Sequence, residues 1–270
     1  MRTIDVNKAW DQLYTRLENE ELLVSERKKI PFIVKIKRIA AVIVLCIIGG
    51  AFAVYFGLKE NEQLISIHNN DNFNTLVSTL EDGSIVYLAS GTILSHPEKF
   101  AADKRYVSLQ GEAQFNVQSN KNCPFIIETQ TVMVEVTGTE FNIKSTEKDA
   151  FELYVMNGSV MVTLKSNGVS DLIESGEMVC LNNNRLQKSL LKNPTNYTQK
   201  MQFKDENLDN IVRVINTLSD KPIVFADSKL KKLEMTITFN NNTIIEMVGL
   251  LCEIFDLKYS ENENDIVIDR

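Results

Sequence analysis

The chain has 270 residues, with 29 Lys and Arg against 36 Asp and Glu, so its formal net charge at pH 7 is −7. Without a basic excess, the sequence excludes an ordinary nucleic-acid binder, because contact with phosphates requires clustered Lys and Arg. Only two histidines and four widely spread cysteines are present, so we expect no zinc site, no Ser/His/Asp triad and no cofactor.

A helix is predicted over residues 4–23, which contain no Pro or Gly and offer Asp5 or Asn7 as a cap. Apolar side chains recur there three or four residues apart and form one stripe around Trp10, the chain's only tryptophan. We assign to this apolar stripe Val6, Trp10, Leu13, Tyr14 and Leu17. So short a segment cannot bury the stripe alone, so a partner must cover it. Five acidic residues favour a soluble protein over the bilayer surface, and self-association of the helix is the other alternative.

A membrane-spanning helix is predicted at residues 39–58, which contain no charged side chain. At about 1.5 Å per residue, this run crosses a hydrocarbon core of about 30 Å, and it is longer than the apolar part of a cleaved signal peptide. A buried helix of a soluble core is the alternative. Residues 1–38 carry a net charge of +3 and the rest of the chain outside the span carries −10. Basic flanks stay inside, so residues 1–38 are predicted to be cytoplasmic and residues 59–270 to lie outside.

Beyond a spacer at residues 59–72, residues 73–190 alternate between apolar and polar side chains. Turn signals such as Asp82–Gly83, Gly111 and Gly138 divide this region into short runs. The predicted strands are Ile85–Leu88, Tyr106–Gln110, Ala113–Gln118, Phe125–Thr129, Val132–Val136, Phe141–Lys144, Phe151–Met156 and Val160–Leu164. Short strands that turn signals separate at regular intervals predict an all-β domain, either a sandwich or a short solenoid.

After a predicted linker at residues 191–198, residues 199–270 contain an internal repeat. The apolar positions that begin at Phe203 recur 36 residues later, beginning at Phe239, with the same class of residue at every place. Each copy reads as strand, helix and strand, so two β-α-β units should form one small α+β domain with a single sheet backed by two helices. Its last strand, Asp265–Asp269, is predicted to offer an open sheet edge.

Six motifs in order resemble those of FecR-type proteins, the transmembrane anti-sigma regulators of cell-surface signalling. They are EDGSIVYLASGTIL (81–94), RYVSLQGEAQFNV (105–117), CPFIIET (123–129), VEVTGTEFNI (134–143), VMNGSVMV (155–162) and SGEMV (175–179). The resemblance implies a single-pass protein of the inner membrane with a periplasmic C-terminus. Its cytoplasmic segment would bind an extracytoplasmic-function sigma factor. Its C-terminal domain, similar to the short N-terminal domain of secretins and TonB-dependent receptors, would bind the signalling domain of such a receptor.

The resemblance also marks a candidate self-cleavage site, because some relatives are split at the Gly-Thr of the GT-x-F motif. In this chain that pair is Gly138 and Thr139. Glu140 or Glu135 could accept the hydroxyl proton, and a tight turn between two strands is the alternative for this stretch. Cleavage would precede release of the cytoplasmic piece by an intramembrane protease, and no other enzymatic activity is expected.

Three questions stay open from the sequence. Cys123 and Cys180 could pair or remain free thiols. The short cytoplasmic segment fits both a pure inhibitor and a regulator that also activates its sigma factor. The second hypothesis for the whole chain is a structural adaptor of the cell envelope, which the amphipathic helix around Trp10 disfavours, because an adaptor needs no such helix.

Overall fold

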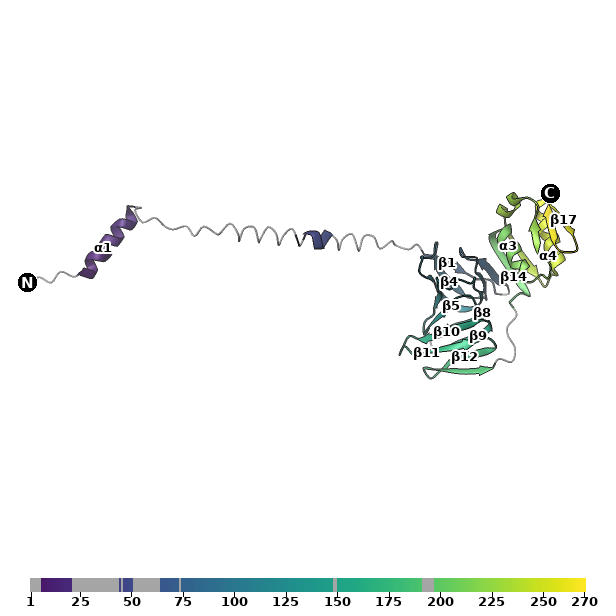
Figure 1. Cartoon of the computed structure of the whole chain (residues 1–270), viewed down its shortest axis with the longest axis horizontal. Helices are drawn as coiled ribbons and strands as arrows, with labels where there is room; N and C mark the ends of the chain where they lie inside the picture. Colours follow the sequence, from purple (N-terminus) through teal and green to yellow (C-terminus); the bar gives the residue numbers. More distant parts are fainter. Residues whose placement is uncertain are drawn as a thin grey trace, which may run out of the picture. The chain divides into compact units, whose positions relative to one another are not determined.

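The computed structural model describes residues 6–20, 44, 46–50, 64–72, 74–147, 150–190 and 197–270 (Figure 1). They belong to two compact units, residues 1–61 and residues 62–270, which we describe separately. Of the predicted membrane span, only residue 44 and residues 46–50 are described, and the rest of that prediction lies outside the described residues. Within the ranges above, no helix is both long enough and apolar enough to cross a membrane.

The first part of the second unit consists of strands. Their bounds are β1 (Leu64–His68), β2 (Thr75–Thr79), β3 (Ile85–Leu88), β4 (Ile93–Pro97), β5 (Arg105–Asn116), β6 (Phe125–Glu128), β7 (Val132–Val136), β8 (Glu140–Glu147), β9 (Ala150–Asn157), β10 (Ser159–Leu164), β11 (Ser170–Glu174), β12 (Glu177–Asn182) and β13 (Arg185–Leu190). The predicted bounds of β3 and β7 are confirmed residue by residue. The all-β prediction for this region is therefore confirmed, while β1, β2, β4, β11, β12 and β13 were not predicted.

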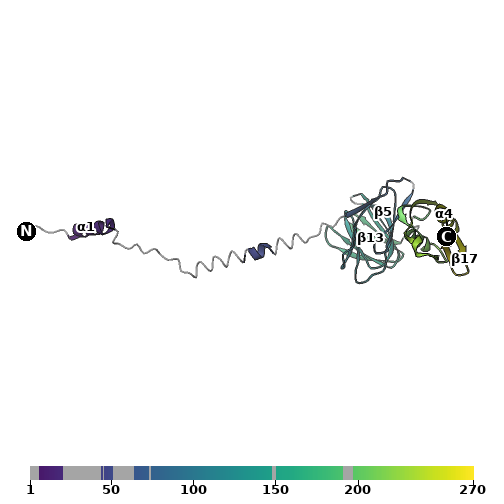
Figure 2. The ribbon, with the colours of Figure 1, turned by 90° about the horizontal axis from the view of Figure 1, so that it is seen from above.

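These strands form two sheets that share β5. One sheet has the order β1-β4-β5-β6-β7-β10-β11, and the other has the order β13-β12-β9-β8-β5-β3-β2. The first half of β5 pairs with β4 and β6, and its second half, from Gly111 onward, pairs with β3 and β8. The strands curve around a common interior, as Figure 2 shows from above, and one cluster of buried apolar side chains lies between them. The observed fold is thus a sandwich that is closed on one side by a shared strand.

Gly111 corrects one prediction, because it does not separate two strands. It lies inside β5 with a φ of 120°, at the point where this strand passes from one sheet to the other. A Cβ atom at this position would lie 2.6 Å from the Oγ1 of Thr92. Only glycine combines this φ with so close an approach. The prediction of a strand end at Gly111 is therefore wrong, because the glycine meets a backbone constraint inside β5.

Aromatic rings connect the two sheets through the core. Phe115 stacks on Phe141 with ring centroids 5.4 Å apart and an angle of 11° between the ring planes. Phe115 also meets Phe125 of the other sheet edge-on, with centroids 6.2 Å apart. All three side chains are fully buried. Because large rings bury the most apolar surface per residue, this cluster supplies much of the cohesion between the sheets.

The spacer and the linker also differ from their predictions. The stretch predicted as a spacer, 59–72, contains β1, which pairs with β4 in antiparallel register. Its residues Leu64, Ile65 and Ile67 interrupt the polar composition that suggested a spacer. Within the predicted linker, residues 191–196 lie outside the described residues, but Tyr197 is buried and donates a hydrogen bond to Glu112 over 2.7 Å.

An ion pair holds the Asp82–Gly83 turn against the start of β5. The Nη1 of Arg105 lies 2.7 Å from the Oδ2 of Asp82, and the Arg105 side chain is only 3% exposed. The guanidinium also donates to the backbone oxygens of Gln118 and Cys123 and lies over the ring of Phe125. The charge of Arg105 is therefore compensated mainly by this one carboxylate.

Replacing Asp82 with Ala should lower the free energy of unfolding by about 3 kcal/mol, because it leaves the buried Arg105 without a counter-charge. Urea unfolding of the full chain in detergent, followed by circular dichroism, measures this loss. Asp171→Ala is the matched control, since it removes an ion pair with Lys188 in which each side chain is more than a third exposed, and exposed pairs contribute little. Equal unfolding midpoints for both variants would contradict the prediction.

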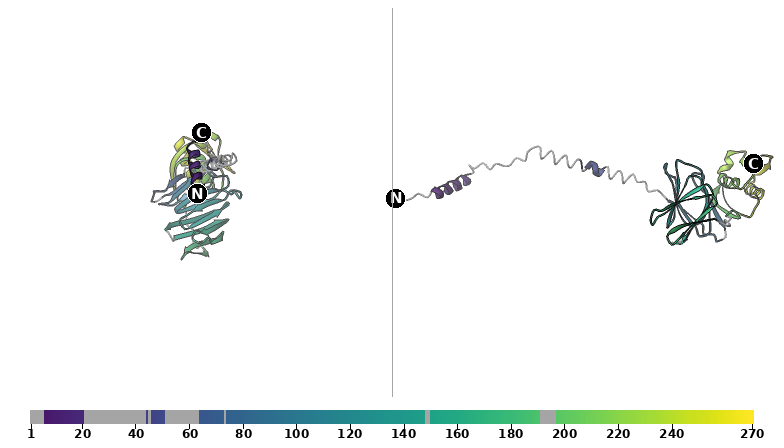
Figure 3. Two further views of the ribbon diagram at one scale, coloured as in Figure 1. Left: turned by 90° about the vertical axis from the view of Figure 1, so that its left-hand side faces the viewer. Right: turned by 60° about the horizontal axis from the view of Figure 1, so that its bottom comes forward.

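The last part of the chain contains two successive β-α-β units, as predicted. Its elements are β14 (Lys200–Asn207), α3 (Leu208–Asn216), β15 (Ile223–Phe225), the 3-10 helix η1 (Ser228–Lys232), β16 (Glu234–Asn240), α4 (Ile244–Phe255), β17 (Lys258–Glu261) and β18 (Ile266–Asp269). Side chains cap both helices: Asn207 accepts from the backbone of Asn210, and Thr243 forms a capping box with Glu246. Figure 3 shows these helices, in green and yellow, packed beside their strands.

The strands of these units do not form the single sheet that was predicted. Strands β14 and β16 pair with each other, and a separate sheet has the order β15-β18-β17. The last strand, β18, is therefore the middle strand of its sheet and not an open edge, which corrects the prediction for Asp265–Asp269. Ile266 and Ile268 of this strand are 2% and 0% exposed. Alternation along a strand shows which face is buried, but it does not show how many neighbours the strand has.

The C-terminal part is joined to the β domain by a sheet and a common core. Strand β14 pairs with β2 in parallel, with Met201 opposite Thr75. Val77, Ile85 and Tyr87, from β2 and β3, belong to the same buried cluster as the apolar faces of α3 and α4. Burial raises the pKa of Tyr87 above its usual value, although a hydrogen bond with Thr217 acts in the opposite direction. The α+β domain predicted at residues 199–270 therefore has no core of its own, because part of its buried cluster comes from the β domain.

Candidate functional site

The predicted apolar stripe lies on α1 (Val6–Asn19), a helix of the first unit (Figure 1). Val6, Trp10, Leu13 and Tyr14 are 62%, 58%, 46% and 60% exposed, and Leu17 is half-buried. None of the residues of α1 is buried. Four large apolar side chains are thus exposed to solvent on one helix, as expected of a surface that a partner covers.

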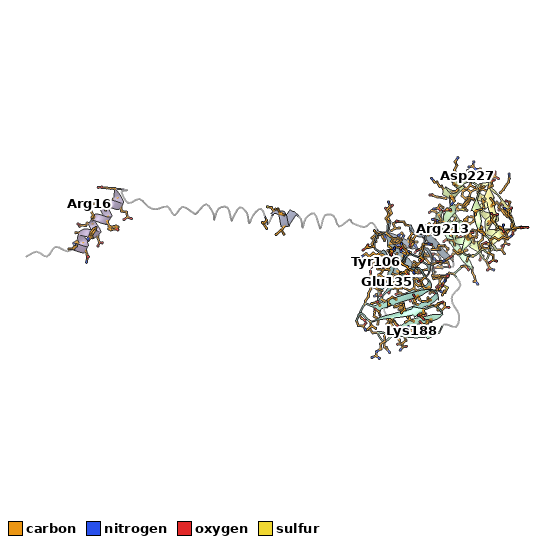
Figure 4. The ribbon with its side chains drawn as sticks, in the orientation of Figure 1. Arg16, Tyr106, Glu135, Lys188, Arg213 and Asp227 are labelled. Carbon is orange, nitrogen blue, oxygen red and sulfur yellow. The ribbon has the colours of Figure 1, made fainter. Side chains whose placement is uncertain are left out.

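The ends of α1 are only partly as predicted. The helix begins at Val6, so Asn7 lies within its first turn and does not cap it, while Asp5 lies outside the described residues. Arg16, labelled in Figure 4, is in the last turn. A positive charge there interacts favourably with the helix dipole. Whether the apolar stripe contacts a sigma factor stays a prediction.

The candidate cleavage site lies where the chain passes from one sheet to the other. Residues 137–139 connect β7, which pairs with β6 and β10, to β8, which pairs with β5 and β9. Two backbone hydrogen bonds hold this connection on both sides of the Gly138–Thr139 bond. Asn120 N–H donates to the oxygen of Thr137, and Val117 N–H donates to the oxygen of Thr139. The candidate bond is thus part of a sheet-to-sheet crossing and not of a hairpin turn.

The side chain of Thr139 has one defined partner. Thr139 is 5% exposed, and its hydroxyl donates to the backbone oxygen of Ser159 over 3.0 Å. This contact arises because the return crossing from β9 to β10, at Gly158, lies beside the outward crossing. The hydrogen bond places the hydroxyl oxygen of Thr139 in one orientation next to the peptide bond that precedes it.

Two glycines leave room for this arrangement. A Cβ atom on Gly158, whose φ is 90°, would lie 3.2 Å from the hydroxyl oxygen of Thr139 and 3.3 Å from the carbonyl oxygen of Gly138. A Cβ atom on Gly138 would lie 2.6 Å from the Cα of Ser119. Side chains at either position would therefore displace the Gly138–Thr139 peptide or its neighbours.

Neither predicted proton acceptor is the hydrogen-bond partner of Thr139. Glu140 accepts a hydrogen bond from the side-chain amide of Gln114 over 3.0 Å. Glu135, labelled in Figure 4, is an exposed residue of β7 opposite Ile126 and Met161. The prediction missed Ser119, Gly158 and Ser159. Gly158 lies in the motif VMNGSVMV, but the sequence does not show which turns lie side by side.

The chain thus combines a helix with an exposed apolar stripe, a β sandwich and a C-terminal α+β domain. It belongs to the FecR family. The model of the family described as "FecR protein" matches residues 74–161, and the model described as "FecR, C-terminal" matches residues 200–268. Together they match more than half of the chain, which confirms the resemblance found from the motifs. No curated protein matches this sequence significantly.

Two crystal structures are similar to this chain, both of a "putative anti-sigma factor from Parabacteroides distasonis ATCC 8503", at 2.50 Å and 1.65 Å resolution. Each is 22% identical in sequence, and each comparison covers 77% of this chain and 99% of the other. The TM-scores are 0.45 and 0.43.

Proposed function

We propose that this FecR-family chain is a membrane-anchored anti-sigma factor. Residues 1–38 bind an extracytoplasmic-function sigma factor in the cytoplasm, residues 39–58 cross the inner membrane once, and residues 59–270 lie in the periplasm. There the chain receives a signal from the signalling domain of an outer-membrane TonB-dependent receptor. The chain transmits this signal to transcription and does not bind nucleic acid directly.

The observation that carries this proposal is the exposed apolar stripe around Trp10 on α1. This helix of 14 residues exposes four large apolar side chains to water, and a partner that covers them would remove this apolar surface from water. The basic residues that follow it and the uncharged run at 39–58 support a cytoplasmic position for the helix. Membership in the FecR family supports a sigma factor as the partner.

The proposal assigns reception of the signal to residues 199–270. If this is correct, the full chain in detergent should bind the purified signalling domain of its TonB-dependent receptor. A chain lacking residues 199–270 should lose this binding. It should also become more sensitive to protease, because Val77, Ile85 and Tyr87 lose their cover. Absence of binding by the full chain would contradict the relay, and additional absence of sigma-factor binding would favour a structural envelope adaptor.

We also propose that the Gly138–Thr139 bond cleaves itself. The hydroxyl oxygen of Thr139 attacks the carbonyl carbon of Gly138, and the bond from this carbon to the nitrogen of Thr139 breaks as the proton passes to that nitrogen. The resulting ester is opened by water, which gives the carboxylate of Gly138 and restores the hydroxyl of Thr139. The fixed hydroxyl and the two neighbouring glycines support this step. An intramembrane protease would then release the cytoplasmic piece.

A further inference from the structure

The sheet β15-β18-β17 has two outer strands, and one of them is covered. The side-chain amide of Asn216, on α3, accepts from the backbone N–H of Ile223 over 2.7 Å and donates to its oxygen over 3.0 Å. This side chain thus occupies the positions that a neighbouring strand would take along β15. Such blocking of an edge prevents pairing with another chain.

Strand β17 has no comparable cover among the described residues. Asn262 N–H donates to the oxygen of Asp265, so these residues form a hydrogen-bonded pair of the antiparallel ladder. Such pairs alternate along a ladder. The next ones are Ser260 with Val267 and Lys258 with Asp269. The backbone N–H and C=O groups of Tyr259 and Glu261 therefore point away from β18, where no described residue pairs with them.

Apolar side chains lie along this open edge. Tyr259 is 40% exposed and lies against Gly249 of α4, with its ring 4.0 Å from the position that a Cβ atom of this glycine would take. Ile245, one helical turn before Gly249, is 38% exposed. Strand β16 is also an outer strand, but its exposed side chains are all polar: Glu234, Thr236, Thr238 and Asn240. Only the edge at β17 thus combines free backbone groups with an apolar anchor among the outer strands of the C-terminal domain.

The charge around this edge is negative. Residues 244–270 contain seven acidic and two basic side chains, which gives a net charge of −5. Lys221 lies 2.7 Å from Glu261 and compensates one of these charges. A segment that pairs with β17 therefore gains from Lys or Arg beside its apolar residues.

We propose that β17 is the strand-addition site of this chain. An extended segment of the partner pairs with the backbone of Tyr259 and Glu261, places apolar side chains beside Tyr259 and Ile245, and carries basic residues toward the surrounding carboxylates. The inference rests on the proposed function, which makes the receptor's signalling domain the source of this segment. It adds the strand that is used and the chemistry that the partner strand must have.

The variant Glu261→Pro tests this site. Proline removes the outward N–H of residue 261 and leaves the hydrogen bonds between β17 and β18 intact, because proline is tolerated on an edge strand whose N–H faces solvent. Binding of the full chain to the receptor's signalling domain should weaken at least tenfold. Glu261→Ala is the matched control, because it removes the ion pair with Lys221 but keeps the N–H, and it should retain most of the affinity.

A second measurement follows from the apolar anchor and from charge. Tyr259→Ser should also weaken binding at least tenfold, and binding by the unaltered chain should weaken with rising salt. If the unaltered chain binds the receptor domain and Glu261→Pro binds equally well, the site is not β17, although the relay stands. If the unaltered chain binds no receptor domain at all, the relay itself is wrong. Binding that is insensitive to salt would overturn the basic character of the partner strand.

Discussion

Replacing Trp10 with Ala should weaken binding of the extracytoplasmic-function sigma factor about thirtyfold or more, which corresponds to about 2 kcal/mol. Trp10 is in the middle of the apolar stripe and is 58% exposed in the chain. Burial of so large a ring against a partner removes more apolar surface from water than burial of any other side chain of α1. Titration of the full chain in detergent against the purified sigma factor measures the change.

Gln12→Ala is the control for this prediction. Gln12 is exposed on the side of α1 away from Trp10, and alanine favours the helix at least as well as glutamine. The affinity of this variant should match that of the unaltered chain. Trp10→Phe should fall between the two, because phenylalanine keeps an apolar ring of smaller area. Unchanged affinity for Trp10→Ala would show that the stripe is not the contact surface.

Local pattern predicted the elements of this fold well wherever side-chain periodicity alone determines them. The strand bounds of β3 and β7, and the two β-α-β units that begin at Phe203 and Phe239, follow from alternation and helical spacing. The stripe on α1 was also assigned from spacing, and the four residues Val6, Trp10, Leu13 and Tyr14 are indeed exposed on the described helix. These features depend on neighbours along the chain, which a sequence contains directly.

The features that were missed depend on contacts between distant residues. A glycine with positive φ at the end of a strand and one inside a strand give the same signal, so Gly111 was read as a turn although β5 continues through it. The alternation of Ile266 and Ile268 predicted a strand, but its place between β15 and β17 depends on the packing of the whole domain. In the same way, the pairing of β14 with β2 joins residues that are far apart in the sequence.

The candidate cleavage site also combines a feature that local sequence predicts with features that depend on distant residues. The Gly138–Thr139 pair is predicted from a motif, but its surroundings come from Ser119 and from the crossing at Gly158, which no local pattern connects to it. The carboxylate of Glu140 was suggested by proximity in sequence, and the structure directs it to Gln114 instead. Residues adjacent in a strand point to opposite faces, so closeness along the chain is a poor guide to a proton acceptor.

Of the substitutions considered for this chain, Thr139→Ala has the largest expected effect. It removes the attacking hydroxyl, so self-cleavage should be lost completely. The purified chain should run on a denaturing gel as two fragments, residues 1–138 and 139–270, and Thr139→Ala should run as one band. Thr139→Ser keeps a hydroxyl and should still be cleaved. Glu140→Gln should also be cleaved, since this carboxylate contacts Gln114 and not Thr139.

Gly138→Ala tests whether cleavage depends on the position of the Gly138–Thr139 peptide as well as on the hydroxyl group. The variant keeps the hydroxyl of Thr139, but its Cβ atom would come within 2.6 Å of the Cα of Ser119. The scissile peptide must therefore shift, and cleavage should slow markedly. After cleavage, the two fragments should still elute together without denaturant, because β8 pairs with β5 along six residue positions. A single full-length band from the unaltered chain would exclude self-cleavage, and the signal would then pass through an intact chain.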